Sequence, residues 1–89
     1  MKAIIAVIGE DRKGILAKIS VACAEANANV LDVTQTVMQS YFAMIMLAEV
    51  TELNCSFGEF SKILQDAGQE IGMTVHVMHE DIFNSMHRV

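Results

Sequence analysis

The residues best placed for chemistry lie in the stretch from Gly9 to Leu16, between an apolar run and a helical pattern. The run before it, residues 3–8, has the composition of a buried strand, and apolar side chains recur at helical spacing after it. Gly14 should therefore stand where a helix begins. The first backbone N–H groups of a helix have no partner inside the helix and carry a partial positive charge. They suit a small anion such as a carboxylate, so we expect any ligand site at this turn.

Other interpretations of the same residues stay open. Gly14 can be a plain turn glycine, and Asp11 an acid favoured by the helix dipole. Arg12 and Lys13 are expected to be solvated turn residues. From residue types and spacing alone, these structural interpretations are favoured over a ligand site. The two glycines have a spacing similar to that of a phosphate-binding loop. However, Ile15 and Leu16 replace the Lys and Ser or Thr that such a loop needs, which excludes nucleotide hydrolysis.

Histidines and acids gather near the C-terminus, at His76, His79, Glu80, Asp81 and His87. Their spacing fits no standard set of metal ligands, so surface histidines are the expected interpretation. Neither of the two cysteines, at positions 23 and 55, has a sequence neighbour that would activate its thiol. We therefore expect no catalytic residues, no metal site and no cofactor, and so no enzyme.

Size and composition limit the class of protein. The chain of 89 residues fits one domain, residues 1–89, and its 53% of hydrophobic residues suggests an oligomer, at least a dimer. A net charge of −5 argues against binding to nucleic acid. The longest apolar run, Phe42–Ala48, is too short to span a membrane, and we see no signal peptide. Two cysteines far apart do not make a disulfide framework, so a cytoplasmic protein is expected.

Periodicity and turn residues predict the elements that position the turn. The predicted strands are Lys2–Ile8, Val30–Met38, Tyr41–Thr51 and Met73–Met78. A first helix is expected over Gly14–Ala26. A second helix should follow a capping box formed by Ser56 and Glu59, with an apolar stripe that includes Phe57, Phe60, Ile63, Leu64, Ala67 and Ile71. Gly72 is its expected stop, and Glu80–His87 should add one or two helical turns.

The order βαββαβ predicts a ferredoxin-like α+β sandwich, a four-stranded antiparallel sheet of order 4-1-3-2 with both helices on one face. A sheet covered on one face should alternate apolar and polar residues. The third strand does not, because Tyr41, Ala43, Ile45 and Leu47 are as apolar as their neighbours. The second face should therefore be covered by the C-terminal segment, by another subunit, or by both.

The motifs resemble those of ACT domains, the small amino-acid-sensing modules of many biosynthetic enzymes. The resemblance lies in Gly9-x-Asp11-Arg12-x-Gly14-Ile15-Leu16 and in Asn29-Val30-x-Asp32-Val33-x-Gln35. It covers nearly the whole chain. Gln35-Thr36-Val37, followed by Tyr41-Phe42-x-Met44, is more narrowly similar to stand-alone ACT proteins, close to the repressor-like proteins of the glycine cleavage system.

The resemblance implies a ligand site between paired domains, since ACT domains hold a small ligand between the first turn of one domain and the second strand of its partner. The matching positions are Asp11, Gly14 and Ile15 in the turn, and Asn29 and Asp32 in the strand. In amino-acid-binding relatives the position of Asp11 is often Asn and that of Lys13 is often Pro. A carboxylate at position 11 disfavours a ligand carboxylate nearby and suits an ammonium instead.

The resemblance thus implies a non-catalytic regulatory module that binds an amino acid at a subunit interface and modulates a protein partner, an enzyme or a transcription factor. A hypothesis from another class is a ligand-free structural oligomerisation module.

Overall fold

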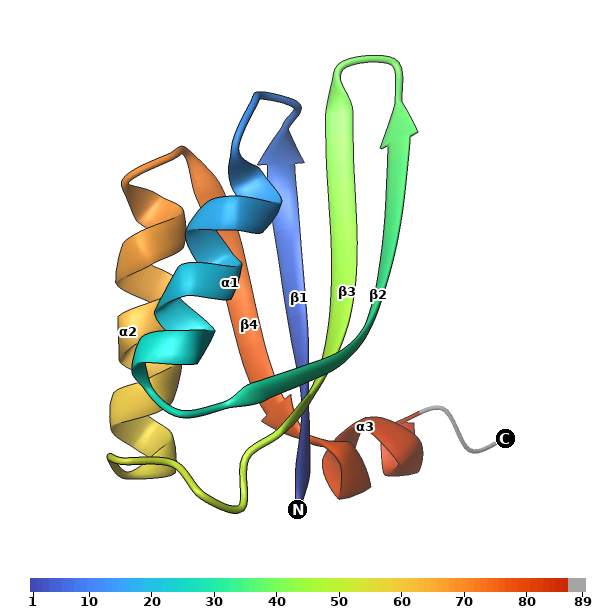
Figure 1. Ribbon diagram of the computed structural model, residues 1–89. Helices are drawn as coiled ribbons and strands as arrows, with labels where there is room; N and C mark the ends of the chain where they lie inside the picture. The colour runs from blue at the N-terminus through green and yellow to red at the C-terminus, as the bar shows by residue number, and fades with distance from the viewer. Residues whose placement is uncertain (87–89) are drawn as a thin grey trace.

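The computed structural model describes residues 1–86 and has the element order βαββαβ followed by a short helix (Figure 1). The strands are β1 (Lys2–Glu10), β2 (Asn29–Met38), β3 (Tyr41–Glu49) and β4 (Met73–His79). The helices are α1 (Ile15–Glu25), α2 (Phe57–Gln69) and α3 (Glu80–Met86). Residue 87, the last of the predicted C-terminal helix, lies outside the described residues. Among residues 1–86, the helices are too short or too polar to cross a bilayer.

The four strands form one antiparallel sheet of order β2-β3-β1-β4, which confirms the predicted ferredoxin-like fold. The register places Glu10 opposite Tyr41 at one end and Lys2 opposite Glu49 at the other. β3 ends two residues before the predicted boundary. The reason is local: the Thr51 N–H donates to the Glu49 carboxylate at 3.1 Å instead of continuing the ladder.

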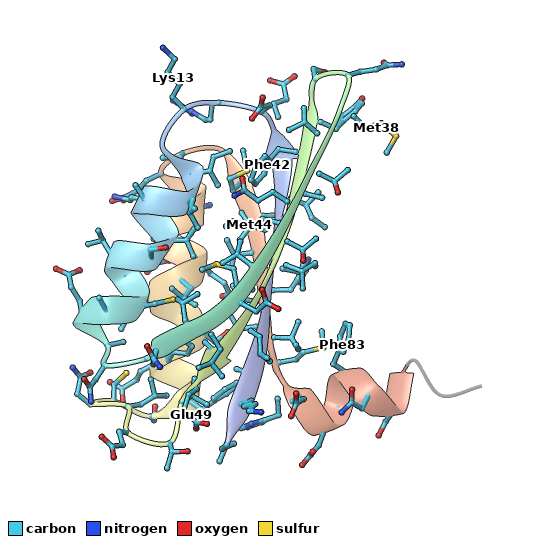
Figure 2. All side chains as sticks on the ribbon, turned by 45° about the vertical axis from the view of Figure 1, so that its right-hand side comes forward. Lys13, Met38, Phe42, Met44, Glu49 and Phe83 are labelled. Atoms are coloured by element: carbon cyan, nitrogen blue, oxygen red, sulfur yellow. The ribbon has the colours of Figure 1, made fainter. Side chains whose placement is uncertain are left out.

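Helices α1 and α2 cover one face of the sheet, and the core lies between these two layers (Figure 1). Phe42 and Met44 point from β3 toward the helices in Figure 2, and both are buried. The largest fully buried side chains are Phe60, Ile5, Ile19, Met44, Met46, Leu64, Val7 and Cys23. One position of the predicted α2 stripe is wrong. Ile63 is 41% exposed, because the buried side of α2 centres on Phe60, Leu64 and Ala67.

The ends of both main helices follow the local chemistry of the sequence. Ser56 accepts a hydrogen bond from the Glu59 N–H at 3.1 Å and Glu59 accepts one from the Ser56 N–H at 3.2 Å, so the predicted capping box is present. After α1, Asn27 adopts the left-handed conformation with φ 64° and donates to the Glu52 carbonyl at 2.7 Å. Asn54 donates in turn to the Glu25 carbonyl at 2.7 Å. These two amides fasten the end of α1 to the loop before α2.

We call the sheet face opposite α1 and α2 the outer face. Strand alternation and register assign to it these residues: Lys2, Ile4, Ala6, Ile8, Glu10, Asn29, Asp32, Thr34, Thr36, Met38, Tyr41, Ala43, Ile45, Leu47, Glu49, Thr74, His76 and Met78. α3 lies at one end of this face, where Ile4 is only 8% exposed (Figures 1 and 2). The predicted covering by the C-terminal segment is thus confirmed for that end alone.

Candidate functional site

The turn from β1 to α1 exposes the backbone that the sequence singled out. The Asp11 N–H donates to the Ser40 carbonyl at 2.8 Å, which ties the turn to the β2–β3 hairpin. Gly14 caps α1 with φ 84° and ψ 7°, and no side chain accepts from the first turn of the helix. Gly14 is exposed and has nothing within 4 Å of the place where a Cβ would stand. An incoming anion can therefore reach the first N–H groups of α1.

The side chain of Ile15 is buried and is not accessible to a ligand. Its side chain is 3% exposed and belongs to the core, so it anchors the start of α1 against the sheet. Its contribution to a ligand would therefore be limited to the backbone N–H. The side chain that remains for recognition is Asp11, which is exposed.

Beside the turn lies a hollow of about 350 Å³, lined by Glu10, Asp11, Arg12, Ile71 and Gly72. Arg12 is exposed in the turn, as expected, and it also donates through Nη1 to the Ile71 carbonyl at 3.1 Å. This bond fastens the β1–α1 turn to the α2–β4 loop across 59 residues of sequence. No local pattern could have revealed it, because the acceptor is a backbone carbonyl distant along the chain. The hollow carries two carboxylates and one guanidinium, a combination suited to a zwitterion.

The second group of candidate residues lies in the first half of β2. Asn29 and Asp32 are exposed, and a register shift between Val30 and Asp32 bulges the strand at Leu31. The Asp32 carboxylate accepts from the Val33 N–H at 2.9 Å through Oδ1. Asp32 therefore stabilises its own bulge with one oxygen and keeps the other for a donor from elsewhere.

A carboxylate missed by the sequence analysis lies beside Asn29. Glu49 stands opposite Asn29 in the register and shares with it a hollow of about 300 Å³. The Met1 ammonium, which donates to Glu49 at 2.8 Å, is the main cause that lowers the pKa of this carboxyl to about 2, followed by the Thr51 hydroxyl. Glu49 is therefore anionic at neutral pH and already has donors of its own.

The two groups of candidate residues lie at opposite ends of the sheet. The turn follows Glu10, which stands opposite Tyr41, whereas Asn29 stands opposite Glu49. Eight residues of strand separate these rows, roughly 25 Å at about 3.3 Å per residue. A free amino acid is much shorter than this distance. Within one copy of the chain, the structure thus brings together Asp11, Gly14 and Ile15, and separately Asn29 and Asp32.

The histidines near the C-terminus and the buried cysteine are the remaining residues that could do chemistry. His79 stacks on Phe57 with ring centroids 3.9 Å apart, so it joins the end of β4 to the start of α2. His76 is exposed on the outer face, and His87 lies outside the described residues. Burial raises the pKa of the Cys23 thiol to about 11, which keeps it protonated and unreactive at neutral pH. Within residues 1–86, His, Cys, Asp and Glu form no cluster suited to a metal ion.

The comparisons with known proteins identify the family to which this fold belongs. The family model of the ACT domain matches residues 2–78, from the first residue of β1 to the last residue but one of β4. The chain belongs to the ACT domain family. It is 49% identical over 88 residues to a UPF0237 protein of Methanocaldococcus jannaschii, a match that covers 99% of this chain and 98% of that one. The resemblance stated from the sequence is confirmed.

Solved ACT structures share the fold over most of the chain. An ACT domain protein from Streptococcus pneumoniae superposes with a TM-score of 0.82 at 33% identity, covering 98% of each chain. The regulatory subunit of aspartate kinase from Thermus thermophilus, in its ligand-free form, gives 0.67 at 28% identity over 86% of this chain and 50% of that one. A putative glycine cleavage system transcriptional repressor gives 0.74 at 19% identity, over 86% of this chain and 44% of that one, and so shares the fold.

Proposed function

We propose that this ACT domain is a non-catalytic regulatory protein of the cytoplasm that binds a free amino acid between two copies of the chain. The ligand would lie between the β1–α1 turn of one copy and the first half of β2 of the other. Binding would change how the paired protein associates with a partner, either an enzyme or a transcription factor.

The observation that carries this proposal is the separation of the two candidate groups. Asp11 and Gly14 of the first group and Asn29 and Asp32 of the second are exposed, and both groups have the polarity that an amino acid needs. Yet the two groups stand roughly 25 Å apart in one chain. A site that uses both groups must therefore be shared between copies. Membership of the ACT family supports this arrangement, and so does the structural likeness to a protein named as a regulatory subunit.

The chemistry of the two groups is complementary to a zwitterion. The first N–H groups of α1, beyond Gly14, suit the carboxylate of the ligand. The free oxygen of Asp32 and the amide of Asn29 suit its ammonium. Asp11 lies in the same turn and would repel the ligand carboxylate at close range. It therefore favours an orientation in which the carboxylate stays at the N–H groups of α1 and the ammonium lies on the side of Asp11.

Regulation then follows from linkage. A ligand that contacts two copies binds the pair and not the separate chains, so it favours the paired state by its differential affinity. In residues 1–86, His, Cys, Asp and Glu form no cluster suited to a metal ion, and burial keeps the Cys23 thiol protonated. We therefore propose that any effect on metabolism passes through another protein.

The test is thermal unfolding of the full chain with each of the twenty amino acids at millimolar concentration. A ligand present at about 100 times its Kd stabilises the protein by about 2.7 kcal/mol. This corresponds to a rise of several degrees in Tm for a chain of this size. The rise should disappear in Asn29→Ala. Asp32→Asn keeps an oxygen for the Val33 N–H while it removes the charge, so it separates ligand binding from the strand bulge.

The absence of a shift with all twenty amino acids would contradict the proposal and favour the alternative, a ligand-free oligomerisation module. A shift that Asn29→Ala and Asp32→Asn both leave intact would contradict the β2 half of the proposed site. Val21→Ala, a change on the exposed side of α1, is the matched control and should leave any ligand-induced shift unchanged.

A further inference from the structure

The β1–α1 turn lies between two other connections at the same end of the molecule, the α2–β4 loop and the β2–β3 hairpin (Figure 1). The α2–β4 loop consists of Glu70, Ile71 and Gly72, between the end of α2 and the start of β4. The proposed ligand site uses the turn and gives this loop no role. The loop nevertheless contacts the chain before the turn, within it and after it.

Before the turn, Gly9 of β1 lies against the loop. A Cβ at position 9 would stand 2.9 Å from the Gly72 carbonyl oxygen and 2.8 Å from the Met73 sulfur. The absence of a side chain at Gly9 is therefore what allows the backbone of the loop to come this close to the end of β1. A displaced loop would disturb the chain where it enters the turn.

Within the turn, two consecutive residues hold the chain in different ways. The Asp11 N–H donates to the Ser40 carbonyl of the hairpin at 2.8 Å, a backbone bond that every residue except proline can make. Arg12 donates through Nη1 to the Ile71 carbonyl of the loop at 3.1 Å, a bond that only a long side chain with a donor can make. Arg12 is therefore the residue at which a substitution can separate the turn from the loop.

After the turn, α1 contacts the loop again through Lys18, which forms an ion pair with Glu70 at 2.5 Å. The two side chains are 41% and 63% exposed, so the pair should stabilise this contact only weakly. The Lys18 N–H donates to the Gly14 carbonyl at 2.9 Å, which places the ion pair one helical turn from the N–H groups available to a ligand. The loop thus contacts both sides of the proposed ligand position.

We propose that Arg12 is a positioning residue that joins the β1–α1 turn and the α2–β4 loop into one unit, so that an amino acid bound at the turn also orders the loop. A ligand that binds the ordered turn more tightly than the loose one shifts both connections together. Glu70 and Gly72 are exposed, so the protein partner of the proposed function can recognise the ligand-bound state at this loop. The ligand half of the inference rests on the proposed function, whereas the tie through Arg12 exists without ligand.

The tie is tested by amide hydrogen exchange of the ligand-free full chain, followed by NMR at fixed pH. Three amides report on it, because each donates to a backbone carbonyl. The Asp11 N–H reports on the turn, with its bond of 2.8 Å. The N–H groups of Ile71 and Gly72 report on the loop, with bonds of 3.0 Å and 3.2 Å.

Arg12→Met removes the donors and keeps an unbranched side chain. It should speed exchange at all three reporter amides by about three- to tenfold, the range expected for the loss of one net hydrogen bond. Arg12→Lys keeps a donor on a similar side chain and should restore most of the protection. The Ala28 N–H, which donates to a carbonyl near the far end of α1 at 2.9 Å, should keep its rate in both variants. An equal change at Ala28 would indicate general destabilisation and overturn the inference.

The matched control is Lys13→Met, which removes the neighbouring cation of the same turn. Lys13 is exposed and points away from the rest of the molecule in Figure 2. Its replacement should leave the three reporter rates unchanged. Equal effects of Lys13→Met and Arg12→Met would show that the charge of the turn, and not the bond to Ile71, protects these amides. Unchanged rates in Arg12→Met would show that the tie does not exist.

The ligand half is tested with whichever of the twenty amino acids raises the Tm of the unmodified chain. This amino acid should slow exchange at Ile71 and Gly72. Arg12→Met should abolish that effect and raise the ligand Kd by about three- to tenfold, because the turn is then ordered only on binding. Lys13→Met should change neither quantity.

The two proposals fail separately. If an amino acid binds but exchange at Ile71 and Gly72 does not slow, the coupling to the loop is wrong and the ligand function stands. If no amino acid raises the Tm, the ligand function fails and the ligand half of this inference fails with it. The exchange rates of ligand-free Arg12→Met still decide whether the turn and the loop form one unit.

Discussion

Gly9 and Gly14 show two different reasons for glycine around one turn. Gly9 pairs with Met73 of β4, and a Cβ there would lie 2.8 Å from the Met73 sulfur and 2.9 Å from the Gly72 carbonyl oxygen. Gly14 has open space around it but a φ of 84°, which other L-residues adopt only at a cost. The first glycine lets β1 approach a neighbouring loop, and the second lets the chain enter α1 with its N–H groups exposed.

The first prediction at the residue scale concerns Gly14. Gly14→Ala should lower the free energy of unfolding by about 1–2 kcal/mol, because the left-handed conformation is disfavoured for alanine. Gly14→Asn should cost less, since asparagine tolerates this conformation better. Denaturation in urea at fixed protein concentration measures both.

Gly58→Ala is the matched control for these variants. Gly58 lies in α2, has no positive φ and has open space for a Cβ. Alanine should there leave stability unchanged or raise it by up to about 1 kcal/mol. Equal destabilisation by Gly14→Ala and Gly58→Ala would show that φ at position 14 is not the cause.

At the scale of elements, the sequence predicts those features that depend on residues close together in the chain. The predicted capping box depends on Ser56 and Glu59, which are three positions apart, and it is present. The exposure of Ile63 and the bond from Arg12 to Ile71 were not predicted. Both depend on how α2 and its following loop sit against the rest of the molecule, which no window of sequence contains.

The capping box gives a pH-dependent prediction for α2. Hydrogen bonds from the Ser56 backbone and hydroxyl lower the pKa of Glu59 below its ordinary value of 4.5. The pKa of Glu59 is lower in the folded state than in the unfolded state. Ionised Glu59 therefore stabilises the folded protein at pH values above its unfolded-state pKa, and this stabilisation is lost as the pH falls through its folded-state pKa. The advantage of the unmodified chain over Glu59→Gln should therefore be largest near neutral pH and shrink below about pH 4.5.

Urea denaturation of both proteins between about pH 7 and pH 3 measures this change. Ser56→Ala, which removes the other half of the box, should cost about 1 kcal/mol at neutral pH. A difference between the unmodified chain and Glu59→Gln that stays constant with pH would show that the Glu59 charge does not stabilise the cap.

At the scale of the whole molecule, the sequence identified the candidate ligand residues without showing that they lie far apart. Their types and the ACT resemblance named Asp11, Gly14, Ile15, Asn29 and Asp32 as one site. In the sheet, the turn residues and the β2 residues lie at opposite ends. Strand pairing, and not distance along the sequence, decides which residues come close together. A site that uses both groups would therefore be a property of two chains, and an experiment with two different chains can isolate it.

Mixing two variants provides that experiment. Asp11→Ala damages the turn half of the proposed site and Asn29→Ala the β2 half, so each variant alone should lose the amino-acid-induced rise in Tm. In a mixed dimer, one of the two sites receives both damaged halves and the other receives both intact halves. If subunits exchange at random in an equal mixture, about a quarter of all sites should be restored. Calorimetric titration with the amino acid that stabilises the unmodified chain would detect this recovery.

The control for this mixture is a chain that carries both Asp11→Ala and Asn29→Ala, mixed with an equal amount of either single variant. Every site in that mixture has at least one damaged half, so no binding should return, and recovery there would show that these two residues do not form the site. No recovery in the first mixture, despite proven subunit exchange, would mean that each site is formed within a single chain. In that case the roughly 25 Å between the two groups requires that only one of them contacts the ligand.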